Sequence, residues 1–142
     1  MYALSIYTLL DASHTYYIID TSEWREEMAD TKDTLVVLWT SGDREVALKM
    51  VFMYSLNAKL KGWWEKVIFI VWGPSAKLLA EDSELQEHIR KMEEVGIVLE
   101  ACKKCSDMYG VSGELERMHI DVKYMGEPLT AYLKEGKRVI TF

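Results

Sequence analysis

Two short apolar runs, LVVLW at residues 35–39 and VIFIVW at residues 67–72, decide the fold. Neither run alternates between apolar and polar residues, which is typical of strands in a parallel sheet whose two faces are both covered. Weaker runs of the same kind follow at residues 97–101, 122–125 and 139–142. The pattern therefore predicts five strands, most of them parallel.

Helical patterns fill the segments between these strands. A Ser83-x-x-Gln86 spacing predicts a capping box inside the second helical segment, and Gly110 is expected to break the third. Strands and helices that alternate at this spacing predict a single three-layer α/β domain with a mainly parallel five-stranded sheet. The helical segments are expected over residues 44–61, 76–95, 103–118 and 129–134.

The first 33 residues do not follow this pattern. Apolar runs at residues 2–10 and 16–19 flank a polar segment at 11–14, and a polar stretch follows at 22–33. The periodicity leaves both a hairpin and a short helical arm open. We interpret residues 1–33 as an N-terminal extension and residues 34–142 as the α/β domain.

Length and charge narrow the class of protein. A chain of 142 residues fits one domain with a hydrophobic core, and a net charge of −6 argues against nucleic-acid binding. No apolar run approaches the roughly 18 residues that a membrane span requires. The first basic residue is Arg25, so the apolar start lacks the positive region of a signal peptide. We expect a cytoplasmic protein with reduced cysteines.

The helical segment at residues 44–61 carries apolar side chains on two sides. A helix of this kind is either deeply buried or packs on the sheet with one side and on a partner subunit with the other. We expect a subunit interface, and a buried core helix is the alternative. The two predicted sides are Val46, Met50, Tyr54 and Ala58, and Leu48, Phe52, Leu56 and Leu60.

Candidate site residues gather in the loops that follow the strands. In an open parallel sheet these loops lie along one edge, where ligands and catalytic groups are found. Both cysteines of the chain belong to this set. The loops span residues 40–43, 73–75, 102–105 and 126–128.

Cys102 is the strongest candidate for chemistry. It ends a predicted strand and begins a helical stretch, where free N–H groups and the helix dipole favour a thiolate. Lys103 and Lys104 add positive charge beside it. Cys105 lies three residues further on, so the two sulfurs can share a helix face and approach each other. We expect the Cys102 thiol to be reachable at this edge.

Other interpretations of the cysteines stay open. Either residue can be a small buried hydrophobe, and a Cys-x-x-Cys spacing also occurs in dithiol oxidoreductases. A structural zinc site would need two more ligands, and the three histidines, His14, His88 and His119, show no paired spacing.

Weaker candidates could support an anion at the same edge. Ser41, Gly42 and Asp43 follow the first strong strand, and Gly73 follows the second. Backbone N–H groups at a helix start bind anions, although an ordinary helix cap at Ser41 or Asp43 is the simpler interpretation. Neither a P-loop nor a dinucleotide-binding glycine pattern is present, so we expect no cofactor and no metal.

These motifs together resemble the DsrE-like family of sulfur-relay proteins, which includes DsrE, DsrF, TusD and YchN-like proteins. The resemblance spans residues 35–142. It depends on the order of LVVLWTSGD at 35–43, WGPS at 72–75, Cys102-x-x-Cys105 with Gly110 eight positions after the first cysteine, and YMG at 124–126.

The resemblance implies a compact parallel α/β subunit that assembles into trimers or hexamers. It further implies a sulfurtransferase-like carrier that holds a persulfide on Cys102, with sulfur donor and acceptor proteins as partners. Cys105 matches a second cysteine that only some members have. Two alternatives remain: a non-catalytic oligomeric binding module and a dithiol oxidoreductase.

Overall fold

The computed structural model describes residues 8–10, 16–18, 22, 25–26 and 33–142, and the chain divides into units at residues 1–30 and 31–142. In the first unit, β1 (Thr8–Leu10) pairs antiparallel with β2 (Tyr16–Ile18). The described residues of this unit therefore support the hairpin alternative. The polar segment 11–14, with His14, lies outside the described residues.

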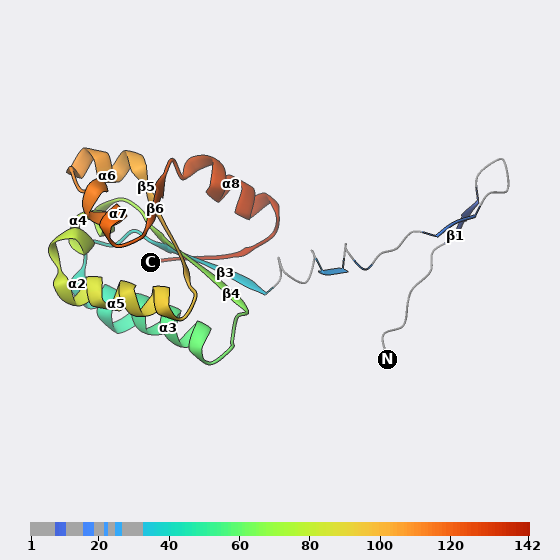
Figure 1. Cartoon of the computed structure of the whole chain (residues 1–142), viewed down its shortest axis with the longest axis horizontal. Coiled ribbons are helices and arrows are strands. Elements are labelled where there is room, and N and C mark those ends of the chain that lie inside the picture. Colours follow the sequence, from blue (N-terminus) through green and yellow to red (C-terminus); the bar gives the residue numbers. More distant parts are fainter. Residues whose placement is uncertain (1–7, 11–15, 19–21, 23–24, 27–32) are drawn as a thin grey trace. The chain divides into compact units, whose positions relative to one another are not determined.

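The second unit is built around a five-stranded sheet in which every pair of neighbouring strands is parallel. The order across the sheet is β6-β5-β4-β3-β7. Helices lie on both sides of the sheet (Figure 1), so the predicted three-layer α/β fold is confirmed. The strands are β3 (Thr34–Trp39), β4 (Lys66–Val71), β5 (Val98–Cys102), β6 (Asp121–Lys123) and β7 (Arg138–Thr141).

The order of the strands decides which helices share a face. The connections from β3 to β4, β5 and β6 all step in one direction, whereas the connection from β6 to β7 steps back across the whole sheet. Right-handed crossovers that run in opposite directions lie on opposite faces. The last helix, α8, accordingly lies across the sheet from α3 and α5 (Figure 1). The helices are α2 (Arg44–Val46), α3 (Phe52–Leu60), α4 (Pro74–Glu81), α5 (Ser83–Glu94), α6 (Lys103–Tyr109), α7 (Ser112–Arg117) and α8 (Gly126–Lys134).

A π-helical turn, Ala47–Val51, joins α2 to α3. The N–H of Phe52 donates to the carbonyl of Ala47, five residues back. This turn takes up an extra residue, so a uniform helical period does not assign the faces correctly across residues 44–61. The two predicted sides are therefore wrong in detail: Phe52 and Ala58 are buried, whereas Met50 and Leu60 are exposed.

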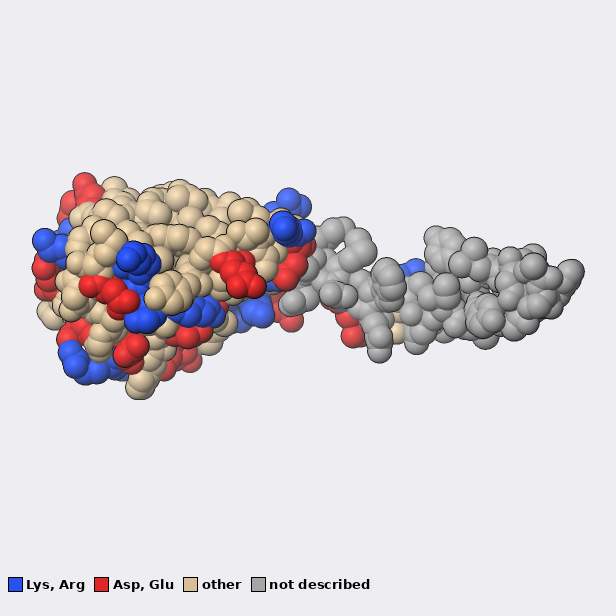
Figure 2. All heavy atoms as spheres, turned by 90° about the horizontal axis from the view of Figure 1, so that it is seen from above, with Lys and Arg blue, Asp and Glu red and all other residues tan. Residues whose placement is uncertain are grey.

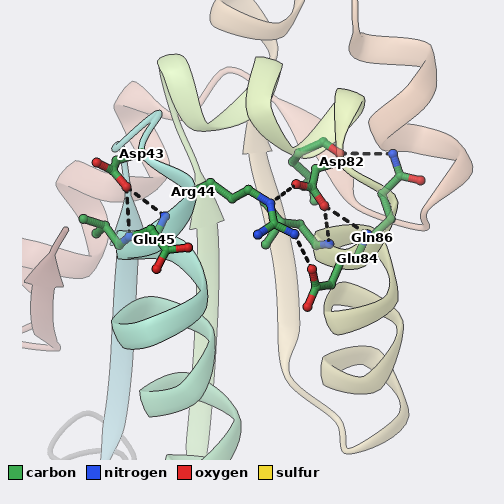
Figure 3. A network of polar contacts seen from close by, with 9 residues as sticks. Asp43, Arg44, Glu45, Asp82, Glu84 and Gln86 are labelled. Carbon is green, nitrogen blue, oxygen red and sulfur yellow. Dashed lines mark hydrogen bonds and ion pairs between the residues drawn. The ribbon is translucent and has the colours of Figure 1, made fainter.

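The junction between α4 and α5 also differs from the prediction. Asp82, rather than Ser83, caps α5, and its carboxylate accepts from the N–H groups of Glu84 (3.0 Å) and Leu85 (3.1 Å). The side chain of Gln86 donates to carbonyls at the end of α4, so no capping box forms. The guanidinium of Arg44 contacts the carboxylates of both Asp82 and Glu84, which ties the start of α2 to this junction (Figure 3).

The two faces of the sheet have unequal cores. One face packs against α3, α4 and α5, and its cluster includes Phe69, Leu85 and Ile89, all fully buried. The opposite face has a smaller cluster, in which Cys102 and Met125 lie with three strand residues. Among the helices that the structure describes, none is long and apolar enough to cross a membrane.

Candidate functional site

Cys102 and Cys105 lie together where β5 passes into α6. Cys102 is the last residue of β5 and the N-cap position of α6, and its extended backbone (φ −72°, ψ 110°) turns the chain into the helix. Cys105 lies one turn into that helix, and its thiol hydrogen-bonds with Cys102. Gly110 ends α6 in a left-handed conformation (φ 71°) that glycine adopts without strain.

The Cys102 thiol is less accessible than we expected from the sequence. Its residue is only 5% exposed, and it packs in an apolar cluster with Ile70, Met125, Leu129 and Tyr132. The position at the carboxyl edge of the sheet is as predicted, but the expectation of a reachable thiol is wrong. The reason is tertiary: α8 and the residue before it, Met125, lie on this face of the sheet.

Cys105 is half-buried, whereas Cys102 is buried, so Cys105 is the more accessible of the two cysteines. Burial, and next the hydrogen bond with Cys102, raise the pKa of the Cys105 thiol above its ordinary value. The backbone of Gly73 and the side chain of Trp72 hydrogen-bond to Cys105 and act in the opposite direction. The net shift keeps Cys105 protonated at neutral pH.

Gly73, a supporting residue predicted from the sequence, lies beside Cys105. Its backbone (φ 74°, ψ −139°) is in a region that favours glycine, and it precedes Pro74, the first residue of α4. This conformation presents the backbone of Gly73 to the Cys105 sulfur. The loop after β4 therefore meets the loop after β5 at the two thiols, as expected for neighbouring parallel strands.

Two other predicted supporting residues, Lys103 and Asp43, make contacts within their own helices rather than with the two thiols. Lys103 forms an ion pair with Asp107 (2.9 Å) one turn along α6, and Lys104 is exposed. Asp43 caps α2 through the N–H groups of Glu45 (2.8 Å) and Val46 (3.1 Å).

The loop after β3 is bonded within the chain. The Ser41 hydroxyl accepts from the N–H of Asp43, and the N–H of Ser41 donates to the Phe142 carbonyl. A Cβ at Gly42 would lie 3.2 Å from the Cβ of Pro74, so this loop packs closely on α4. A cavity of about 290 Å³ lies beside Gly42 and Pro74 and is bordered by Tyr109 of α6.

A buried polar cluster beside Cys102 was missed in the sequence. Glu100 lies two residues before Cys102 on β5, so both side chains are on the same face of the sheet. The Glu100 carboxylate is buried and accepts from the ammonium of Lys123 (2.8 Å) and the hydroxyl of Tyr132 (2.9 and 3.1 Å). Lys123 also pairs with Asp121 at 2.7 Å.

Burial and contacts within this cluster shift the pKa values of Tyr132 and Lys123. Burial, and next the bond to Glu100, raise the pKa of Tyr132 to about 12. Burial would lower the pKa of Lys123, but the bonds to Asp121 and Glu100 outweigh it and raise that pKa. Register pairs Cys102 with Lys123 across β5 and β6, so the two residues are neighbours in the sheet. The sequence signal that could have revealed this cluster is Glu100, the single acidic residue inside the predicted strand at 97–101.

The surface around this site has mixed charge. Seen from the side of α6 and α8, acidic and basic side chains are interspersed, and no continuous basic area forms on this face (Figure 2). Within the part of the chain that the structure describes, no group of three or more His, Cys, Asp or Glu side chains could hold a metal ion.

The fold and the paired thiols define a parallel α/β domain with a dithiol at the carboxyl edge of its sheet. A conserved protein of unknown function from Bacteroides thetaiotaomicron, BT1422, is 41% identical, with a TM-score of 0.75 over 78% of this chain and 95% of that one. The chain therefore belongs to the same family as this Bacteroides protein.

The YchN protein from E. coli shares the fold at 13% identity, with a TM-score of 0.59 over 78% of this chain and 99% of that one. This likeness establishes a YchN-like, DsrE-like fold. Comparison with protein-family models gave no match, and comparison with curated proteins gave none.

Proposed function

We propose that the protein is a sulfur carrier that holds a persulfide on Cys102 and passes the outer sulfur to a partner protein. The contact between the Cys102 and Cys105 thiols at the start of α6 is the observation that carries the proposal. Cys105 lies one turn along α6 from Cys102, so its thiol is placed to attack a persulfide held there. The YchN-like fold is consistent with this function, which the resemblance implies.

The chemistry balances without an added oxidant. The Cys102 thiolate attacks the outer sulfur of a donor persulfide, a new S–S bond forms at Cys102, and the donor leaves as a thiolate. Transfer to an acceptor thiolate repeats the step in the other direction. When no acceptor is present, Cys105 can attack the Cys102 sulfur, which forms the Cys102–Cys105 disulfide and releases hydrogen sulfide.

Persulfide loading followed by intact-mass analysis tests the proposal. We expect wild-type protein to gain one sulfur mass or, after resolution, to lose two hydrogens. Cys105→Ser should retain the added sulfur longer, because the resolving thiol is absent. Cys102→Ser should gain none.

The rival functions give different results in the same experiment. A sulfur adduct on Cys102→Ser that equals that of wild type would refute the proposal. A dithiol oxidoreductase would lose activity with either substitution, whereas a carrier can retain loading in Cys105→Ser. A binding module with incidental cysteines would show no adduct in any variant.

We also propose that the protein forms a homo-oligomer through the face of α2, the π turn and α3 that the sheet leaves uncovered. Met50, Met53 and Leu60 on this face are each at least half exposed, which is unusual for large apolar side chains on one helix. Light scattering should show a trimer or hexamer for wild type and smaller species for Met53→Lys. Lys49→Glu, on a charged position of the same segment, is the matched control.

Residues 34–142 are proposed to be the sulfur-carrying domain, with residues 1–33 as an extension of separate role. A chain that lacks residues 1–33 should load sulfur on Cys102 as wild type does. Loss of loading in a truncated protein that is still folded would show that the extension is part of the site.

A further inference from the structure

The helix α8 covers the Cys102 face but is loosely packed there. None of its nine residues is fully buried, and Leu133 is 57% exposed. By contrast, α5 buries Leu85, Ile89 and Met92 completely on the other face. Because a helix is held to a sheet mainly by its buried apolar side chains, α8 is the less firmly attached of the two.

The polar attachment of α8 is concentrated at one point. The Tyr132 hydroxyl, on α8, donates to both oxygens of the buried Glu100 carboxylate, on β5. Replacing a buried ion pair by apolar residues of similar volume is often neutral or stabilising, so burial of this carboxylate is not by itself evidence of added stability. What it does provide here is a directional bond between the sheet and α8, two residues along β5 from Cys102.

The ends of α8 suit movement of the helix as a unit. It begins at Gly126, where an added Cβ would meet no neighbouring atom, and it is followed by Gly136 in the left-handed conformation (φ 77°). The Lys123 ammonium stays on the sheet side through β6, so Glu100 would keep one cationic partner if Tyr132 moved away. Displacement of α8 therefore need not leave a buried charge unpaired.

We propose that α8 is a movable cover over the Cys102 thiol and that the bond between Tyr132 and Glu100 is its latch. Reagents and partner thiols reach Cys102 when this bond breaks and α8 moves off the sheet, while the strands remain paired. The inference concerns access to Cys102 and holds for any thiol reagent, so it does not depend on the sulfur-carrier proposal.

The test uses Cys105→Ser protein, in which Cys102 is the one remaining cysteine of the chain. The rate of iodoacetamide alkylation is measured by intact mass under native conditions. Tyr132→Phe removes the latch hydroxyl and keeps the ring, and we expect Cys102 to be alkylated about tenfold faster. Tyr124→Phe is the matched control, because it loses the same hydroxyl from a side chain that is 65% exposed, and its rate should not change.

Global unfolding must be separated from movement of α8. The free energy of unfolding of each variant is measured by urea denaturation, and alkylation is repeated in low concentrations of urea. If movement of α8 alone exposes Cys102, the alkylation rate is nearly independent of urea concentration. If global unfolding exposes it, the alkylation rate rises with urea by the full slope of the denaturation curve. Glu100→Gln, which weakens the same bond from the sheet side, should accelerate alkylation in the same direction.

Three results would overturn the proposal. The first is an unchanged alkylation rate in folded Tyr132→Phe, the second is an equal acceleration in Tyr124→Phe, and the third is a rate that follows global unfolding. The proposed function fails separately, when persulfide loading leaves no sulfur on Cys102 although alkylation reaches it.

Discussion

The two faces of one sheet differ in what covers them and in what they can do. Three successive connections pack α3, α4, α5 and α7 on one face, whose core contains the aromatic contact of Phe52 with Trp39 at 5.0 Å. On the other face α8 makes the return connection, and that face holds Cys102 and the ion pair of the buried Glu100 with Lys123. The face that strand order leaves with fewer helices is the one that holds Cys102 and Glu100.

This difference follows from topology rather than from composition. Adjacent residues of a strand point to opposite faces, and along β4 both faces are apolar, with Val67 and Phe69 in one cluster and Ile68 and Ile70 in the other. Only the direction in which the chain crosses the sheet decides how many helices reach each face. A thinly covered face can open at a low free-energy cost, whereas a densely packed face cannot.

The largest effect is expected on the densely packed face. Leu85→Ala removes a fully buried side chain of α5 and should lower the free energy of unfolding by about 2–5 kcal/mol. Urea denaturation followed by circular dichroism measures the change. A loss well under 2 kcal/mol would contradict the dense packing that we assign to this face.

The same substitution on the other face should cost less. Leu129→Ala shortens a half-buried side chain of α8, and we expect a loss of about 1–2 kcal/mol. Alkylation of Cys102 should accelerate in this variant as well, because Leu129 packs in the cluster that buries the thiol. Equal losses for the two leucines would remove the distinction between the faces.

A smaller effect is expected at the cap of α5. Asp82→Ala removes an N-cap and should cost about 1 kcal/mol near neutral pH. The bond from Arg44, and next the N–H of Leu85, lower the pKa of Asp82 below its ordinary 3.8. The stabilisation is therefore present above pH 3.8 and is lost as the pH falls through the lowered pKa, so the two proteins should converge in acid. A difference that persists unchanged in acid would contradict this.

The smallest effect on stability is expected at alkaline pH and concerns the bond between Tyr132 and Glu100, the proposed latch. The pKa of Tyr132 is raised from 10.0 to about 12, so the folded protein favours the protonated phenol. Its contribution is complete below pH 10 and is lost as the pH rises towards 12, and at pH 10 it has fallen by only a few tenths of a kcal/mol. Thermal denaturation across this range should show a steeper decline for wild type than for Tyr132→Phe. Parallel declines would contradict the raised pKa of Tyr132 in the folded protein.

Some local features of the site could be predicted and others could not. The spacing of Cys102 and Cys105 predicts their contact, because residues three apart share a helix face. The start of α8 at Gly126 rather than at residue 129 was missed, since Gly126 and Pro128 are weak helix formers in isolation. Asp82 was missed as a cap because Ser83-x-x-Gln86 matches a capping box equally well.

The sequence by itself determined the five strands of a mainly parallel sheet, the alternating helices and the pairing of two thiols at the end of β5, because each depends on residues close together in the chain. The tertiary structure alone decided that Cys102 is buried and that Glu100 meets Lys123 and Tyr132. These partners lie 23 and 32 residues further along the chain. Such contacts depend on strand order and crossover direction, which no local pattern of residues encodes.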